Sequence, residues 1–312
     1  MSVLIVGSFI IDCVARTNRA PLQGETVVGN SFNTYLGGKG ANQAFACIRM
    51  GCETYLAGAV GNDNFGNQFI DAMKKEGFDT SYVLRKDNHP TGTSLVIVEE
   101  SGQNRICMVP GANLVYTSTD IIENLEELIK KVDYVIAQFE MKYEIVSTLA
   151  SLCEKHGKKF VLNPAPARSI DDDVLSRLYL ITPNETELGI IINSEKPLIT
   201  INDYVDGAKK LISKGVKNVI VTLGTNGSLL VNKNGINHVE SYKVKAIDTV
   251  GAGDSYTGSL VAMLDSGKSI VEAMKIATAV AAVEVTKHGA IPAIPYKKEV
   301  EEFIKKNEEY NK

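Results

Sequence analysis

The sequence predicts an α/β protein in which helices cover both faces of a mainly parallel sheet. Strand-like and helix-like segments alternate along the chain, as they do where helical crossovers join parallel strands. The first segment, "VLIVG" at 3–7, is a continuous apolar run ending in glycine, which is typical of a strand buried on both faces. Glycines also close helical segments, at Gly51 and Gly215, where they mark helix ends.

The alternation gives an order of elements. Gly37 and Gly38 precede the first helix, and after Asp254 the side chains of Leu260 and Leu264 fall on one helix face. The predicted strands are 3–7, 54–60, 133–139, 159–163, 178–183 and 218–223. The predicted helices are 39–51, 65–76, 143–156, 201–214, 254–266 and 269–286. In such sheets, ligands bind outside the carboxyl ends of the strands.

Two segments, about 12–36 and 91–110, lack this alternation. Both contain alternating β-forming residues broken by turn residues, with a hairpin expected at 100–103. We expect a small separate sheet that acts as a lid over the ligand end of a single domain spanning 1–312. Because no helix covers this sheet, we expect its exposed surface to pair with a second copy, giving a homodimer.

Composition excludes several classes of function. A net charge of −4 argues against nucleic acid or an anionic membrane as the main partner. The five cysteines have no CxxC spacing, so neither a disulfide framework nor a zinc site is expected. The short apolar run at the start has no basic residues before it, and no stretch approaches the roughly 18 apolar residues of a membrane span. We therefore expect a cytoplasmic protein.

The stretch "DTVGAGD" at 248–254 places Gly251, Ala252 and Gly253 directly before Asp254, at the start of a predicted helix. Unpaired backbone N–H groups and the helix dipole attract anions at such a place. One interpretation is phosphoryl transfer, with the N–H groups holding the phosphoryl charge and Asp254 accepting a hydroxyl proton. The other is an ordinary helix start, with Asp254 as a favourable first-turn anion.

The stretch "YLGGKGANQAFACIRMG" at 35–51 sets Gly38, Lys39 and Asn42 at another junction of strand and helix. A tight turn accounts for these residues, but so does a polar ligand whose hydroxyls meet the Asn42 amide. Two nucleotide motifs are rejected. "AMLDSGKS" at 262–269 joins two helices and lacks the first glycine of a P-loop, and "GTNG" at 224–227 lacks the dinucleotide fingerprint.

The chain resembles the ribokinase-like, phosphofructokinase-B-type carbohydrate kinases from residue 3 to residue 296. The motifs that carry the resemblance are "GGKGANQA" (37–44), "NPAPA" (163–167), "TPNETE" (182–187), "VTLGTNG" (221–227) and "DTVGAGD" (248–254). They occur in family order and spacing, and the first two resemble the ribokinase branch. The resemblance implies a ribokinase-like three-layer α/β/α fold and transfer of the ATP γ-phosphate to the primary hydroxyl of a pentose.

The resemblance also implies a role for each matched residue. Asp254 is the expected base, and the backbone of Gly251, Ala252 and Gly253 is the expected anion hole. The expected sugar ligands are Asp12, Gly38, Lys39, Asn42 and Glu140, covered by lid residues near Ser94, Val96 and Met108. The expected nucleotide contacts are Asn184, Thr222, Gly224, Gly227 and Thr278, and Glu187 is expected to organise Mg²⁺ through water. A potassium site is expected at Asp248, Val250, Glu284, Lys287, Gly289 and Ala293.

Some of these residues also have plain structural interpretations. Asp12 would cap a turn after a strand, Glu140 would be a strand-end charge, and Asn184 with Glu187 would form a helix cap. Ala293 stands where relatives often carry a hydroxyl ligand for potassium, so potassium activation is less firmly implied.

Ile10 stands where ribokinases carry an asparagine that binds sugar hydroxyls, whereas deoxyribokinases have an apolar residue there. A ribokinase, a 2-deoxyribose kinase, and a nucleoside or other sugar kinase therefore remain open. A non-catalytic sugar or nucleoside sensor is the most remote alternative, because the complete "GAGD" motif is present.

Overall fold

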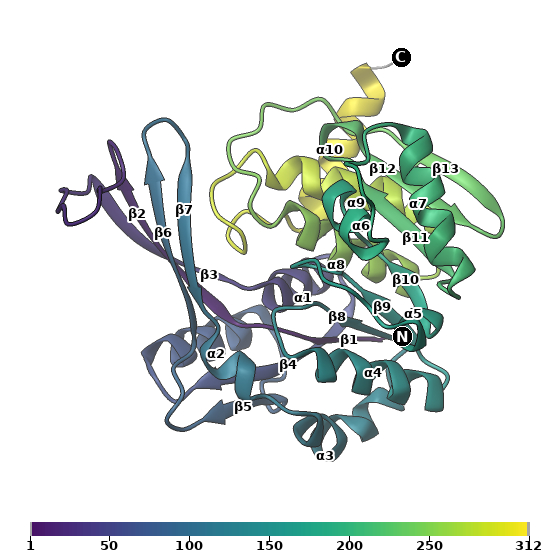
Figure 1. Ribbon diagram of the computed structural model, residues 1–312, viewed down its shortest axis with the longest axis horizontal. Coiled ribbons are helices and arrows are strands. Elements are labelled where there is room, and N and C mark those ends of the chain that lie inside the picture. Colours follow the sequence, from purple (N-terminus) through teal and green to yellow (C-terminus); the bar gives the residue numbers. More distant parts are fainter. Residues whose placement is uncertain (1, 311–312) are drawn as a thin grey trace.

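The computed structural model describes residues 2–310, which form a nine-stranded sheet, a four-stranded sheet and the helices around them (Figure 1). The strand order of the large sheet is β13-β12-β11-β10-β9-β8-β1-β4-β5, and within it only the pairs β11–β12 and β12–β13 are antiparallel. Its strands are β1 (Ser2–Val6), β4 (Glu53–Gly61), β5 (Val83–Lys86), β8 (Tyr134–Ala137), β9 (Lys159–Leu162), β10 (Leu178–Ile181), β11 (Asn218–Thr222), β12 (Ser228–Asn232) and β13 (Gly235–Val239).

Helices cover the two faces of the large sheet in separate groups. One face carries α3 (Ser118–Ile129), α4 (Tyr143–Lys155), α5 (Asp172–Ser176), α6 (Glu185–Ile191) and α7 (Ile201–Ser213). The other carries α1 (Lys39–Arg49), α2 (Asn64–Glu76), α8 (Ala252–Asp265), α9 (Ile270–Glu284) and α10 (Lys297–Tyr310). The three-layer α/β/α fold expected from the sequence is therefore confirmed.

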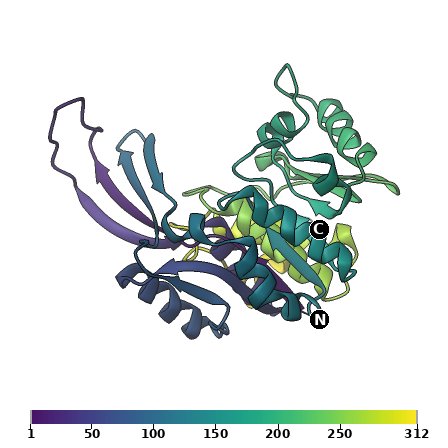
Figure 2. The same cartoon turned by 60° about the horizontal axis from the view of Figure 1, so that its bottom comes forward.

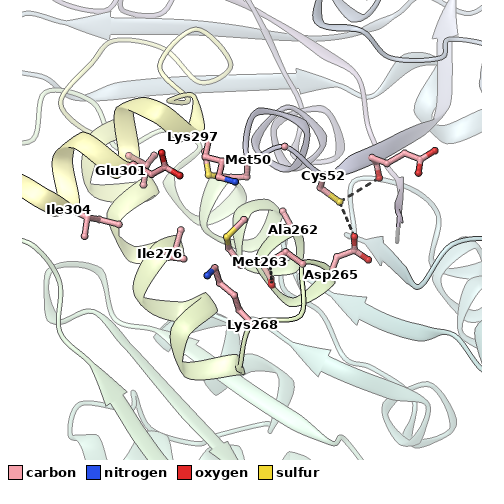
Figure 3. Close-up of a pocket in the computed structure, with 14 residues that line it drawn as sticks. Met50, Cys52, Ala262, Met263, Asp265, Lys268, Ile276, Lys297, Glu301 and Ile304 are labelled. Carbon is pink, nitrogen blue, oxygen red and sulfur yellow. Dashed lines mark hydrogen bonds between the residues drawn. The ribbon is translucent and has the colours of Figure 1, made fainter.

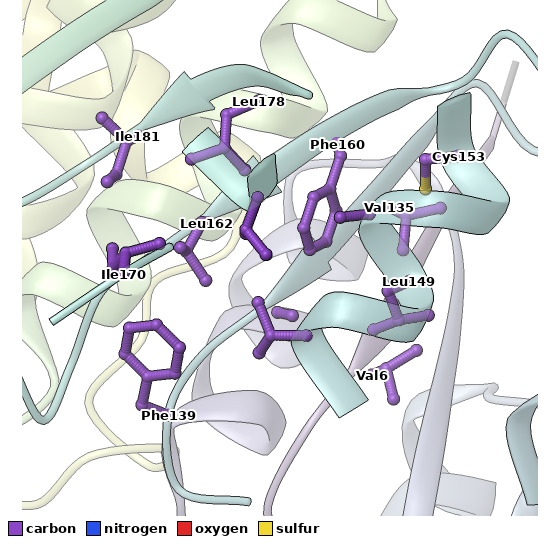
Figure 4. Close-up of a cluster of buried hydrophobic side chains, with 14 of the residues drawn as sticks. Val6, Val135, Phe139, Leu149, Cys153, Phe160, Leu162, Ile170, Leu178 and Ile181 are labelled. Carbon is purple, nitrogen blue, oxygen red and sulfur yellow. The ribbon is translucent and has the colours of Figure 1, made fainter. Parts of the chain in front are cut away.

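Strand side chains alternate between two apolar cores. Leu4 and Val6 of β1 point into the core beneath α3 to α7, while Val3 and Ile5 enter the core beneath α1, α8 and α9. The first core includes Phe160, which lies among side chains of β8, β9 and α4 (Figure 4). Burial on both faces explains why the strands are almost entirely apolar in sequence.

The small sheet projects from one end of the body in both views (Figures 1 and 2). Its order is β3-β2-β6-β7, from β2 (Ile10–Thr17), β3 (Ser31–Gly37), β6 (Gly92–Glu99) and β7 (Asn104–Val109), and β6 and β7 form the expected hairpin. Residues 18–30, expected within this sheet, connect β2 to β3 without strand structure. Large apolar side chains are exposed on it, at Phe32, Leu95, Ile106, Met108 and Val109.

The sequence located most central elements within a few residues, but it missed several peripheral ones. The missed elements are β5, α3, α5 and α10, and α6 was expected only as the helix that an Asn184–Glu187 cap would open. β5 is four residues long, and α5 and α6 have five and seven residues, too few for a periodic pattern. The strand expected at 133–139 ends at Ala137, so Glu140 lies beyond the strand and does not end it. No helix within residues 2–310 is long and apolar enough to cross a membrane.

We predict that Phe160→Ala lowers the free energy of unfolding by about 3–5 kcal/mol, because the buried ring leaves a cavity between sheet and helix. Chemical denaturation measures this loss. Leu22→Ala is the control, since Leu22 is 69% exposed and its truncation should change stability by less than about 0.5 kcal/mol. Equal effects of the two substitutions would contradict the assignment of this core.

Candidate active site

Polar residues gather where the central parallel strands end. Gln138, Asn163 and Thr182 each follow directly on the last residue of a strand, after β8, β9 and β10 respectively. All three side chains are buried, although the strands before them are apolar. Buried polar side chains need hydrogen-bond partners, so a cluster at this edge marks a site built around polar groups.

Asp254 lies in the first turn of α8, at the same end of the sheet, and is only 6% exposed. Gly251 precedes the helix in the left-handed conformation, with φ 89°, which a residue with a side chain rarely adopts. Within residues 2–310, the backbone N–H groups of Gly253 and Asp254 have no hydrogen-bond partner. This helix start therefore presents free donors beside a buried carboxylate, as the sequence predicted.

Two neighbouring residues of α1 hold the Asp254 carboxylate. Asn42 Nδ2 donates to Oδ2 at 2.9 Å, and Gln43 Nε2 donates to Oδ1 at 3.2 Å. Gln43 also donates to Asn163 Oδ1 at 3.1 Å. The Asn42 amide, expected to face sugar hydroxyls, therefore also orients Asp254.

The expected sugar residues meet at the junction of β1, β2 and α1. Glu140 accepts hydrogen bonds from Ser8 Oγ at 2.5 Å and from the Lys39 backbone N–H at 2.8 Å. Burial raises the pKa of Glu140, and the positive charge of Lys39 acts in the opposite direction. The carboxylate of Asp254, followed by that of Glu140, raises the pKa of Lys39. The lysine thus shares one electrostatic environment with both acids.

Asp12 lies inside β2 and does not cap a turn, so the structural interpretation of this residue was wrong. Ser94 Oγ of the neighbouring strand β6 donates a hydrogen bond to Asp12 Oδ1. Burial raises the pKa of Asp12, and this hydrogen bond lowers it. Gly38 precedes α1 with φ 91°, and a Cβ there would lie 2.8 Å from the Ser8 carbonyl oxygen.

Ile10 begins β2 and is 4% exposed. It pairs with Gly37 on one side and Gly92 on the other, two neighbours without side chains. Its aliphatic side chain offers no hydrogen bond to a ligand, so a hydroxyl against it would be left unpaired.

Most of the expected nucleotide residues lie either at the start of α6 or at the end of β11 and the turn after it. Asn184 and Glu187 form a capping box at the start of α6, and Asn184 pairs with Thr222 as an isolated bridge. Gly224 begins the short 3₁₀ turn that follows β11, and Gly227 comes directly after that turn. Burial raises the pKa of Glu187, and the charges of Lys39 and Asp254 also act on it. The capping role expected as the structural alternative for Asn184 and Glu187 is therefore present, and it leaves them close to the charged centre.

Thr278 lies in α9, which packs against β12 and β13. Its hydroxyl donates to the Met274 carbonyl oxygen at 2.8 Å within the helix, so its methyl group is the part free for packing.

Hydrogen bonds connect several of the expected potassium residues between the start of α8 and the end of α9. Asp248 accepts backbone hydrogen bonds from Val250 and Gly289, each at 3.1 Å. The Glu284 carbonyl oxygen accepts a hydrogen bond from the Lys287 backbone N–H. Ala293, four residues after Gly289, is buried. Within the described residues, no group of three or more His, Cys, Asp or Glu side chains could hold a metal ion. Any cation here would therefore depend largely on backbone carbonyls.

The side chain of Glu284 was not expected to matter. It is 1% exposed and accepts a hydrogen bond from Ser255 Oγ through Oε2, while Oε1 has no partner among residues 2–310. A Cβ on Gly251 would lie 2.8 Å from Oε1, so the carboxyl group packs directly under the start of α8. Burial, together with the charges of Asp254 and Asp248, raises the pKa of Glu284 to about 8.

Sequence reasoning also missed Ser8, Gln43, Gln138 and Asn163. The available signal was position, because Gln138 and Asn163 follow apolar strands and Gln43 adjoins Asn42 within a quoted motif.

A separate cavity of about 510 Å³ lies at the far end of α1 and α8, lined by Met50, Cys52, Met263 and Asp265 among others (Figure 3). It is at the opposite end of α8 from Gly251 and is not the active site.

We predict that Glu284→Gln removes a pH dependence of stability. Between its ordinary value of 4.5 and about 8, the folded state binds the Glu284 proton more tightly than the unfolded state does. The free energy of unfolding of the wild type should therefore fall by a few kcal/mol across this range, and glutamine should abolish that fall. Denaturation with tetramethylammonium as the only buffer cation measures it; parallel curves for the two proteins would contradict it.

Comparison with known proteins agrees with this site. The family described as pfkB family carbohydrate kinase matches residues 1–297. A ribokinase of Staphylococcus aureus is 35% identical over 304 residues, covering 96% of this chain and 98% of its own. A deoxyribokinase of Salmonella typhi is 33% identical over 309 residues, covering 99% of this chain and all of its own.

Among solved structures, an Arabidopsis thaliana ribokinase complexed with ribose and ATP has a TM-score of 0.90 at 30% identity, covering 97% of this chain and 98% of its own. The large sheet, the projecting small sheet and the Asp254 helix start are thus parts of a known kinase fold. The chain belongs to the pfkB family of carbohydrate kinases and is an ATP-dependent sugar kinase.

Proposed function

We propose that this kinase transfers the γ-phosphoryl group of ATP to the primary 5-hydroxyl of D-ribose or a close analogue. The observation that carries the proposal is the buried Asp254 carboxylate beside the N–H groups of Gly253 and Asp254, which have no hydrogen-bond partner within residues 2–310. The similarity to the Arabidopsis ribokinase that is complexed with ribose and ATP supports the choice of a pentose as acceptor and of ATP as phosphoryl donor.

In the proposed reaction, Asp254 accepts the proton of the sugar hydroxyl as its oxygen bonds to the γ-phosphorus. The bond from that phosphorus to the bridging oxygen breaks, and ADP leaves with the electron pair. The N–H groups of Gly253 and Asp254, with the backbone of Gly251 and Ala252, stabilise the charge on the transferring group. Asn42 and Gln43 support this role, because they fix both oxygens of the carboxylate.

The sugar would lie against Asp12, Gly38, Lys39, Asn42 and Glu140. Two acids and a lysine, each shifted in pKa by burial or by its neighbours, suit a ligand rich in hydroxyl groups. The small sheet would act as a lid, which is supported by the hydrogen bond that its residue Ser94 donates to Asp12, one of the proposed sugar ligands.

The nucleotide would lie against Asn184, Thr222, Gly224, Gly227 and Thr278. Mg²⁺ would be bound through water by Glu187, which is consistent with a hard cation that keeps much of its hydration. Potassium would be held by Asp248 and by carbonyl oxygens of Val250, Glu284, Lys287, Gly289 and Ala293. Oε1 of Glu284 has no hydrogen-bond partner among the described residues, and this supports a cation in this region, because a neighbouring positive charge would offset the burial of the carboxylate.

A second candidate substrate, 2-deoxy-D-ribose, is favoured by Ile10. An apolar wall suits a carbon that carries no hydroxyl, whereas a buried ribose hydroxyl there would lose a hydrogen bond at about 1–3 kcal/mol. The similar deoxyribokinase of Salmonella typhi supports this alternative.

The exposed apolar side chains of the small sheet, among them Phe32 and Ile106, support a homodimer formed through the lids.

Asp254→Asn should lower kcat by about a thousandfold or more, because the amide keeps the shape of the carboxylate but cannot accept the proton. A coupled ADP-release assay with Mg-ATP and each pentose measures this loss. Unchanged turnover in the variant would remove Asp254 from the role of base and overturn the proposed mechanism.

Wild-type kcat/KM for ribose should exceed that for 2-deoxyribose by less than about a hundredfold, and deoxyribose should be preferred if the Ile10 wall dominates. Ile10→Asn should shift the ratio toward ribose by about tenfold or more, because it restores a partner for the hydroxyl. Ile10→Val, which keeps the wall apolar, is the control. A ratio that Ile10→Asn leaves unchanged would show that position 10 does not select the sugar.

A further inference from the structure

A chain of buried amides extends from Asp254 into the interior. Gln43 Nε2 has two hydrogens, and it donates to Asp254 Oδ1 at 3.2 Å and to Asn163 Oδ1 at 3.1 Å. Gln43 Oε1 accepts a hydrogen bond from Gln138 Nε2 at 2.6 Å. Both glutamine side chains are fully buried, so water does not compete for these groups.

The direction of each amide in this chain is determined by its partners. If the Gln43 amide were turned over, its oxygen would face two acceptors, Asp254 Oδ1 and Asn163 Oδ1, and its NH₂ group would face that of Gln138. Asn163 cannot turn over to compensate, because its own NH₂ group donates to the Thr182 carbonyl oxygen at 3.1 Å. One arrangement therefore pairs both ends of the Gln43 and Asn163 amides, and it presents a donor to Asp254.

Gln138 is the member of this amide chain that lies farthest along it from Asp254, and its side chain is packed against the backbone. Its Oε1 has no hydrogen-bond partner among residues 2–310 and packs against the backbone, since a Cβ on Gly7 would lie 2.4 Å from it. Gln138 follows β8, and within the described residues its side chain makes no hydrogen bond to Asp254 or to the groups proposed to bind substrates. The only hydrogen bond of its side chain within the described residues is the one it donates to Gln43.

We propose that Gln43 and Gln138 are positioning residues, which form an amide relay that fixes the rotamer of the Asp254 carboxylate for proton transfer. This inference rests on the proposed role of Asp254 as base. Gln138 acts only through Gln43, so its replacement should reduce kcat while binding of sugar and ATP is retained.

Gln138→Glu tests the relay with a signal that a merely structural role would not give. While the introduced carboxyl group is protonated, its O–H can donate to Gln43 Oε1 and preserve the relay. Once ionised, the carboxylate is only an acceptor, so it draws the Gln43 NH₂ group toward itself and turns the Gln43 oxygen toward Asp254. We expect kcat, relative to the wild type, to fall by about tenfold between about pH 6 and about pH 9, with each KM within about twofold.

Gln138→Met is the second variant, because it fills a similar volume without a donor. It should lower kcat by about three- to tenfold at every pH, again with little change in KM. Asn218→Leu is the matched control: Asn218 accepts from Asn232 Nδ2 at 2.9 Å at the opposite end of the sheet, so its loss should affect stability and not kcat.

The proposal is overturned if kcat of Gln138→Glu follows the wild type at every pH. If that variant does not fold, Gln138→Met decides, and a wild-type kcat in it overturns the relay. Asp254→Asn, assayed in parallel, separates the two hypotheses. If it keeps its turnover, the proposed function fails; if it is inactive while the Gln138 variants keep kcat, only the relay fails.

Discussion

The close contact between α1 and α8 is the constraint on which the rest of the site depends. A Cβ on Gly258 would lie only 2.1 Å from the Gln43 carbonyl oxygen, so the helices can approach this closely only because that position has no side chain. Gly258 stands one helical turn after Asp254, and Gln43 adjoins Asn42 in α1. The same contact therefore brings both amides within hydrogen-bond distance of the Asp254 carboxylate.

A second close contact sets α1 against the large sheet. A Cβ on Gly40 would lie 2.4 Å from the Gly7 Cα, so the first turn of α1 rests directly on the end of β1. Beyond Gly7 the chain leaves the large sheet and enters β2 of the small one. The start of α1, the end of β1 and the start of the small sheet thus meet at one point, where Glu140 binds Ser8 and the Lys39 backbone.

The site contains more buried carboxyl groups than basic side chains. Asp12, Glu140 and Glu187 are acids whose pKa values are raised by burial, and Lys39 is the cation that acts on two of them. Glu284 adds a further buried carboxyl group under the start of α8. Such a centre favours ligands that bring hydroxyl groups and cations, which is consistent with a sugar and a magnesium-bound nucleotide.

The sequence by itself determined the alternation of strands and helices and the position of Asp254 at a helix start. Both are local properties, since an apolar run such as 3–7 and a glycine turn such as 251–253 act through neighbouring residues. The motifs also indicated the family, which the comparisons confirmed. The roles assigned to most site residues remain predictions.

Only the tertiary structure decided which side chains meet. Gln43 and Asp254 are 211 positions apart, and Gln43 and Gln138 are 95 apart, so no local pattern predicts their hydrogen bonds. The same holds for Glu284, whose raised pKa depends on burial beneath a distant helix start, and for Asp12, which strand pairing placed inside β2. These properties arise from packing between remote segments, because burial and partners exist only once the layers have assembled.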